Sequence, residues 1–164
     1  MSVYDTTSFP GSLSSKMRDP GNEVVYDTDG LFVRSFGEGT LKNAFDITAA
    51  NDGRVMVVDW LNSCVHIFSE DGVHLNNFKL QVRYSKIAFL FHRESESVVI
   101  AGERGFPLHV EVFTKDGDFV RSTQIHEEPI LSIQGVTVTT DGRIAVLLAF
   151  IGRNTKKNCK VLVI

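Results

Sequence analysis

The residues of this 164-residue chain that could recognise a partner are cations, aromatic rings and amides in loop-like segments. An aromatic ring can stack on a nucleotide base or anchor a protein interface, and arginine adds charge and hydrogen bonds to either contact. These residue types in these segments predict binding rather than catalysis. The candidate binding residues are Lys42, Asn43, Trp60, Asn62, Arg83, Tyr84, Arg104, Phe106, Arg153 and Lys156.

The charge of the chain bears on which partner is expected. The net charge is −3, and Asp59, Glu103, Glu127 and Glu128 share the candidate segments and leave them near neutral. Binding to nucleic acid depends strongly on cations that neutralise phosphates. We therefore expect a protein partner first and single-stranded RNA second.

Patterns typical of catalytic or metal sites are weak. The histidines show no zinc-site spacing, and Ser63 and Ser132 have no recognisable His and Asp partners. Cys64 and Cys159 are expected to be free thiols, since the first ten residues lack the basic and apolar regions of a secretory signal. No apolar run reaches the about 18 residues of a membrane helix. We expect a cytoplasmic protein that is not an enzyme, does not bind a membrane and holds no cofactor.

Regularly spaced Asp-Gly pairs predict the elements that position these residues. Asp29-Gly30, Asp71-Gly72 and Asp116-Gly117 follow similar short apolar runs and lie 42 and 45 residues apart. A second series, Asp52-Gly53 and Asp141-Gly142, is spaced by 89 residues, about two such periods. Each pair predicts a two-residue type I′ hairpin turn, because glycine accepts a positive φ without steric cost.

A period of this length with four short strands per unit is typical of a β-propeller blade. We predict an all-β chain that forms a partial β-propeller of about three four-stranded antiparallel blades, with residues 1–21 as a flexible tail or linker. Open sheet edges could then favour self-association. The predicted propeller spans residues 22–164, and its blade pieces are 22–37, 44–78, 86–123 and 132–164.

One stretch resembles a known family of repeats. Val58-Asp59, Asn62-Ser63-Cys64, Val65-His66-Ile67-Phe68 and Asp71-Gly72 look like an NHL repeat: a second strand ending near Asp, a loop with Asn, a third strand ending in an aromatic, and an Asp-Gly hairpin. The match is good over 46–78, looser over 87–123 and loosest over 132–164.

The resemblance implies a function as well as a fold. In tripartite-motif proteins the NHL propeller binds protein or RNA at one end, and any ubiquitin-ligase activity would lie in a separate RING domain. Other related propellers are metal-dependent hydrolases or lyases, whose axial metal needs ligands from many blades; such a fragment is a further alternative.

In a four-strand meander, the loops between strands 2 and 3 and between strand 4 and the next strand 1 share one end of the sheet. These are the 2–3 and 4–1 loops, and the candidate residues fall on them. Variable loops on a rigid sheet are common binding sites. The predicted function is therefore a non-catalytic interaction module that binds a protein through this end.

Overall fold

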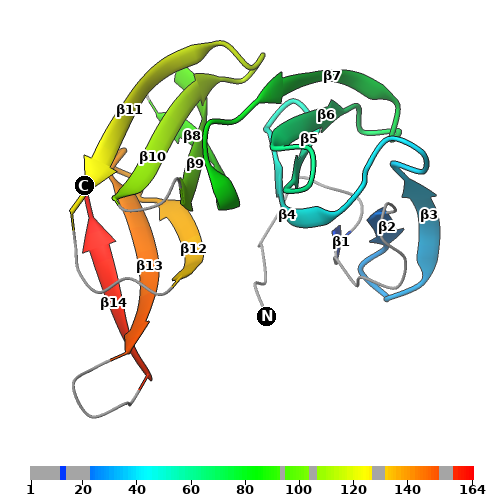
Figure 1. Cartoon of the computed structure of the whole chain (residues 1–164). Coiled ribbons are helices and arrows are strands. Elements are labelled where there is room, and N and C mark those ends of the chain that lie inside the picture. The colour runs from blue at the N-terminus through cyan, green and yellow to red at the C-terminus, as the bar shows by residue number, and fades with distance from the viewer. Residues whose placement is uncertain (1–11, 14–22, 93–94, 104–106, 127–131, 152–156) are drawn as a thin grey trace.

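The computed structural model describes residues 12–13, 23–92, 95–103, 107–126, 132–151 and 157–164 (Figure 1). All regular elements in this part of the chain are β-strands, and they form four antiparallel sheets. The described residues include no helix long and apolar enough to span a membrane.

Each sheet is a meander in which strands adjacent in sequence are hydrogen-bonded neighbours. Sheet A contains β1 (Ser12–Leu13), β2 (Glu23–Tyr26) and β3 (Phe32–Phe36). Sheet B contains β4 (Ala44–Ala49), β5 (Val55–Asp59), β6 (Cys64–Phe68) and β7 (His74–Lys79). Sheet C contains β8 (Arg83–His92), β9 (Ser95–Glu103), β10 (Leu108–Thr114) and β11 (Phe119–Ile125). Sheet D contains β12 (Ser132–Val138), β13 (Ile144–Ile151) and β14 (Lys157–Val163).

The first strands of sheets B, C and D contact one another in turn. β4 lies beside β8, and β8 lies beside β12, whereas the fourth strands β7 and β11 lie outermost (Figure 1). Sheets that share an inner axis through their first strands are the blades of a propeller. The prediction of an all-β partial propeller is thus confirmed.

Three apolar cores hold the sheets together, one at each junction. Their residues alternate along the strands, so one face of a strand packs on the preceding sheet and the other on the following sheet. The junction of sheets A and B holds Val25, Phe36, Leu41, Ala44, Ile47, Val55, Val57 and Phe68. The junction of sheets B and C is built around Met56, Val58, Val65, Ile67, Phe78, Ile87, Val98, Ile100 and Phe113. The junction of sheets C and D is built around Val99, Ala101, Val110, Val112, Ile133, Val136, Ile144, Val146 and Leu148.

One short strand lies where the sequence predicted no regular structure. β1 lies within residues 1–21, which were expected to be a tail, and pairs with β2 to give sheet A a third strand. The rest of that segment lies outside the described residues.

The Asp-Gly turns are not of type I′, because that turn needs a positive φ at both central residues and only the glycines have it here. The Asp116-Gly117 turn between β10 and β11 of sheet C shows which turn forms instead. Gly117 N–H donates to Thr114 O, and Thr114 N–H donates to Asp118 O. This is a three-residue loop with a glycine bulge.

The turn glycines also allow the sheets to approach closely. Gly117 has a φ of +99°, and a Cβ there would lie 2.6 Å from Cδ1 of Phe78 on sheet B. Gly72 has a φ of +82°, and its Cβ would lie 2.7 Å from Cβ of Phe36 on sheet A. Each of these turns is therefore seated on the last strand of the preceding sheet, β3 for Gly72 and β7 for Gly117. Gly30 has the same kind of φ, +79°, but nothing within 4 Å.

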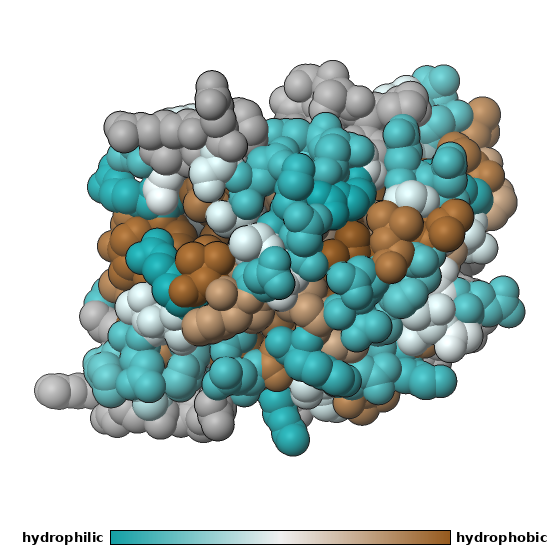
Figure 2. All heavy atoms as spheres, turned by 90° about the horizontal axis from the view of Figure 1, so that it is seen from above, coloured by the Kyte–Doolittle hydropathy of each residue, from teal (hydrophilic) through white to brown (hydrophobic). Residues whose placement is uncertain are grey.

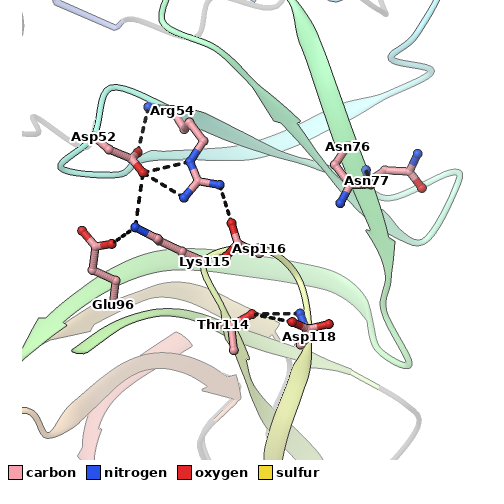
Figure 3. Close-up of polar contacts among 9 residues, drawn as sticks. All are labelled: Asp52, Arg54, Asn76, Asn77, Glu96, Thr114, Lys115, Asp116 and Asp118. Atoms are coloured by element: carbon pink, nitrogen blue, oxygen red, sulfur yellow. Dashed lines mark hydrogen bonds and ion pairs between the residues drawn. The ribbon is translucent and has the colours of Figure 1, made fainter.

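An ion-pair network joins sheets B and C at the end of the sheets where the Asp-Gly turns lie (Figure 3). The Arg54 guanidinium contacts Asp52 of its own turn, and its Nη1 lies 2.8 Å from Oδ1 of Asp116 in the turn of sheet C. Lys115 Nζ lies 3.6 Å from Oδ2 of Asp52 and also pairs with Glu96. Hydrophobic burial and this network therefore act on the same junction.

Gly117→Ala is expected to lower the free energy of unfolding by about 2–4 kcal/mol, because a positive φ strains an alanine and its Cβ would overlap Phe78. Gly30→Ala is the matched control and is expected to cost about 1–2 kcal/mol, since only the backbone strain applies. Urea unfolding of both variants measures the difference. Equal losses would show that the turn glycine does not set the distance between the sheets.

Candidate functional site

A buried carboxylate fixes the two loops at the predicted binding end of sheet B. Asp59 ends β5 and is 0% exposed. Its Oδ2 accepts a hydrogen bond from the Lys42 backbone N–H at 2.7 Å, and its Oδ1 accepts one from the Asn43 N–H at 3.3 Å. These donors belong to the 4–1 loop that enters β4. Asp59 therefore holds that loop against the end of its own strand.

The same carboxylate organises the 2–3 loop that follows it. The Asn62 backbone N–H donates to Oδ1 at 3.3 Å, and the Asn62 side-chain amide donates to Oδ2 at 3.0 Å. The Trp60 N–H donates to Asn43 O at 3.2 Å, which joins the two loops directly. Ser63 closes the loop with a φ of +47°. A loop with this many fixed backbone groups presents its side chains in a defined arrangement.

The loop pair brings four of the predicted residues together. Lys42 and Asn62 are exposed, and Asn43 and Trp60 are half-buried. Leu61 lies between Trp60 and Asn62, is 56% exposed, and was not among the predicted residues. An isolated leucine within a polar loop is the signal that could have identified it.

The other predicted residues are only partly placed. Arg83 is exposed at the start of β8, which is the same end of sheet C. The backbone of Tyr84 lies in β8, but its side chain is outside the described part. The remaining four predicted residues, Arg104, Phe106, Arg153 and Lys156, also lie outside the described residues.

The carboxylate arrangement is not repeated in sheet C. In sheet B, Asp59 of the second strand pairs with Cys64 of the third strand. In sheet C, Gly102 of the second strand pairs with His109 of the third strand in the same way, so Gly102 occupies the position equivalent to Asp59. A Cβ at Gly102 would lie 2.5 Å from Cγ2 of Val82, so this space is filled by an apolar side chain. The Asp59 carboxylate that fixes the loops of sheet B thus has no counterpart at the equivalent position of sheet C.

Three polar side chains of β6 and β7, Cys64, His66 and His74, contact one another in series. Cys64 Sγ lies 3.3 Å from His66 Nε2, and His66 Nδ1 lies 3.0 Å from Nε2 of the exposed His74. Burial, reinforced by His74, lowers the pKa of His66, whereas burial and the nearby Asp59 raise the pKa of Cys64. A neutral imidazole beside a protonated thiol lacks the thiolate that nucleophilic or metal chemistry requires. No group of three His, Cys, Asp or Glu among the described residues is arranged to hold a metal ion.

Glu23 on β2 has a strongly shifted carboxyl pKa. It is buried at the first residue of the strand, and burial raises its pKa to about 7. A shift of this size can mark a catalytic acid, but burial is the whole cause here, with no charged partner contributing. The group is better explained as a carboxyl that folding keeps protonated.

Comparison with known proteins supports the fold. No family model matches the chain, and no curated protein matches it. Among solved structures, the WD40 repeats of RRP9 align with a TM-score of 0.61 at 11% identity, over 93% of this chain and 46% of that one. Virginiamycin B lyase from Staphylococcus aureus aligns with a TM-score of 0.57 at 14% identity, over 86% of this chain and 48% of that one. BBS1N, solved in complex with ARL6DN, gives 0.53 at 15% identity, over 93% and 46%.

The chain spans about half the length of each of these structures. At such low identities the likeness concerns the backbone alone. The similar proteins differ in activity, and a shared fold does not transfer one. The chain therefore has a β-propeller-like fold, with one loop pair fixed by a buried carboxylate.

Asp59→Ala is expected to lower the free energy of unfolding by about 3–5 kcal/mol, since it removes the acceptor of several partly buried N–H donors. Asp71→Ala, at an exposed turn of the opposite end, is the control and should change stability by no more than about 0.5 kcal/mol. Urea unfolding measures both. A stable Asp59→Ala variant with unchanged loop amide shifts in NMR spectra would show that the carboxylate does not hold the loops.

Glu23→Gln is expected to stabilise the protein at pH 8. The folded-state pKa of Glu23 is raised to about 7 from 4.5, so the folded state binds the extra proton between these values and wild-type stability falls as pH rises through that window. The variant should therefore gain about 2–3 kcal/mol at pH 8 relative to its effect at pH 4. Denaturant titrations at both pH values test this, with exposed Glu38→Gln as the control. A gain that is independent of pH would contradict the assignment.

Proposed function

We propose that this chain is an NHL-like, non-catalytic propeller module that binds a protein partner through the 2–3 and 4–1 loops at the Asp59 end of sheet B. The observation that carries the proposal is the loop pair itself, which Asp59 fixes from both sides. Loops ordered before binding lose less conformational entropy when a partner arrives.

The side chains at this end favour a protein partner. Leu61 offers apolar surface and Trp60 a half-buried ring, and polar Lys42 and Asn62 lie around them. An apolar centre with a polar rim is the usual composition of a protein interface, and tryptophan is enriched at its strongest contacts. Lys42 and Arg83 are exposed cations that single-stranded RNA would use instead.

The NHL assignment rests on the roles of two residues. The resemblance placed an Asp at the end of the second strand and an Asn in the following loop, and here Asp59 and Asn62 are hydrogen-bonded to each other.

A non-catalytic role is supported by the burial of Cys64 and His66, which separates the nearest thiol and imidazole from solvent.

The double variant Trp60→Ala/Leu61→Asp tests the binding surface. Proteins captured from a cell extract by the immobilised wild type and identified by mass spectrometry should bind the variant about 10-fold or more weakly. Val120→Asp, which replaces an exposed aliphatic residue on the outer strand β11, is the matched control and should bind as wild type does. Thermal unfolding of each variant confirms that the fold is kept.

Two results would overturn the proposal. If the loop variant and wild type retain the same proteins with equal affinity, this end of sheet B is not the interface. If the loop variant instead loses binding to a pool of single-stranded RNA, and that binding weakens steeply with salt, the ligand is RNA.

A further inference from the structure

The Asp59 end of sheet B presents an excess of positive charge to solvent. It is formed by residues 37–43, 59–63 and 79–83, and hydrogen bonds join these three segments. Their exposed cations are Lys42, Lys79 and Arg83. Their acids are Glu38, which is exposed, and Asp59, which is 0% exposed. The exposed cations of these segments therefore outnumber the exposed acid by three to one.

The sequence predicted a near-neutral end because it counted Asp59 with the exposed charges. In the structure both Asp59 carboxylate oxygens accept hydrogen bonds from N–H groups of residues 42, 43 and 62. The carboxylate thus points into the protein and cannot contact a partner. Lys42 contributes only its backbone N–H to these bonds, so its ammonium group stays exposed. For sheet B the prediction of a near-neutral end was wrong.

The Lys79 side chain is held against the 2–3 loop. Its Nζ donates a hydrogen bond to Asn62 O at 3.2 Å, and the next residue, Leu80, donates its N–H to Ser63 O at 2.9 Å. An ammonium group has three N–H donors, so two remain for a partner's carboxylate. A cation that is already held in place loses less conformational entropy on binding.

One apolar side chain is exposed among these cations. Leu61 is 56% exposed, whereas the other aliphatic residues of the three segments are buried. These are Leu41, Leu80 and Val82. A leucine offers an apolar contact but no aromatic face on which a base could stack. This composition favours the carboxylates of a protein over the phosphates of RNA.

The Asp-Gly turn end of sheet B has the opposite charge. Its residues 50–54 and 69–73 contain one base, Arg54, and three acids, Asp52, Glu70 and Asp71. An acidic partner is therefore repelled from one end of the sheet and attracted to the other. In the view of Figure 2, surface hydrophobic side chains form separate patches with hydrophilic ones between them. Charge can accordingly orient a partner where apolar area is divided.

We propose that the Asp59 end of sheet B binds an acidic segment of its partner protein, with carboxylates on Lys42 and Lys79 and an apolar side chain on Leu61. This rests on the proposed function, which assigns a protein partner to the same loops. Arg83 adds a third cation, but the strand pairing places half-buried Glu103 opposite it. The two lysines are therefore the residues to test.

The first test is selection of short random peptides displayed on phage against the immobilised full chain. The enriched peptides are expected to carry a net negative charge and at least one apolar residue. The Lys42→Glu/Lys79→Glu variant should lose this preference for acids. Arg121→Glu/Arg143→Glu changes the net charge equally at two exposed arginines of sheets C and D, and should keep it.

The second test measures the affinity of one enriched peptide, labelled with fluorescein, by fluorescence anisotropy. Lys42→Glu and Lys79→Glu should each weaken binding about 10-fold. Arg121→Glu should change it by less than about 2-fold, because salt screens a charge that lies beyond the contact. A peptide whose acids are replaced by lysine should bind Lys42→Glu/Lys79→Glu better than it binds wild type. Circular dichroism checks that each variant is folded.

Neutral or basic peptides in the selection, or no enrichment at all, would overturn the inference. So would a pool of single-stranded RNA that binds more tightly than the peptide and through the same two lysines. The proposed function is separated by protein capture from the cell extract. If Trp60→Ala/Leu61→Asp loses the captured proteins and Lys42→Glu/Lys79→Glu retains them, the proposed function stands and the acidic partner is wrong. If both variants retain them, both proposals fail.

Discussion

The structure depends on one physical constraint: each inner sheet buries both of its faces between two neighbours. β5 and β6 are buried along their whole length, including positions that a one-sided sheet would expose to water. Burial of apolar area on this scale is the main favourable term in folding, at about 25 cal/mol per Å². The sheets must therefore pack at close range, and the turn glycines and the Arg54 network follow from that requirement.

The repeat could be predicted from the sequence because it rests on local signals. Glycine is favoured wherever φ is positive, so the Asp-Gly pairs give the hairpins and their spacing gives the period. The turn type could not be predicted in the same way, since type I′ and bulged turns share this dipeptide and differ in the φ of the aspartate. β1 was missed because a strand of two residues owes its existence to pairing with β2 rather than to its own pattern.

The candidate site was predictable in position but not in construction. Loop location followed from the order of the strands, which placed Lys42, Trp60 and Asn62 at one end. The role of Asp59 depends on backbone N–H groups that lie 16 and 17 residues earlier in the chain, and no spacing rule predicts such contacts. Leu61 was missed for a simpler reason: a single leucine carries no periodic signal.

In sheets B and C the turn before the last strand is seated on the preceding sheet, which gives the fold a one-dimensional character. Gly72 packs on sheet A and Gly117 on sheet B, so each sheet contacts only its immediate neighbours through these turns. Stability in such a stack is a sum of unit and nearest-neighbour terms, as in solenoid repeats. Sheets B and C have two such neighbours and sheets A and D one. In an isolated chain, amide hydrogens should therefore exchange fastest in the two terminal sheets, and local opening should spread inward from them.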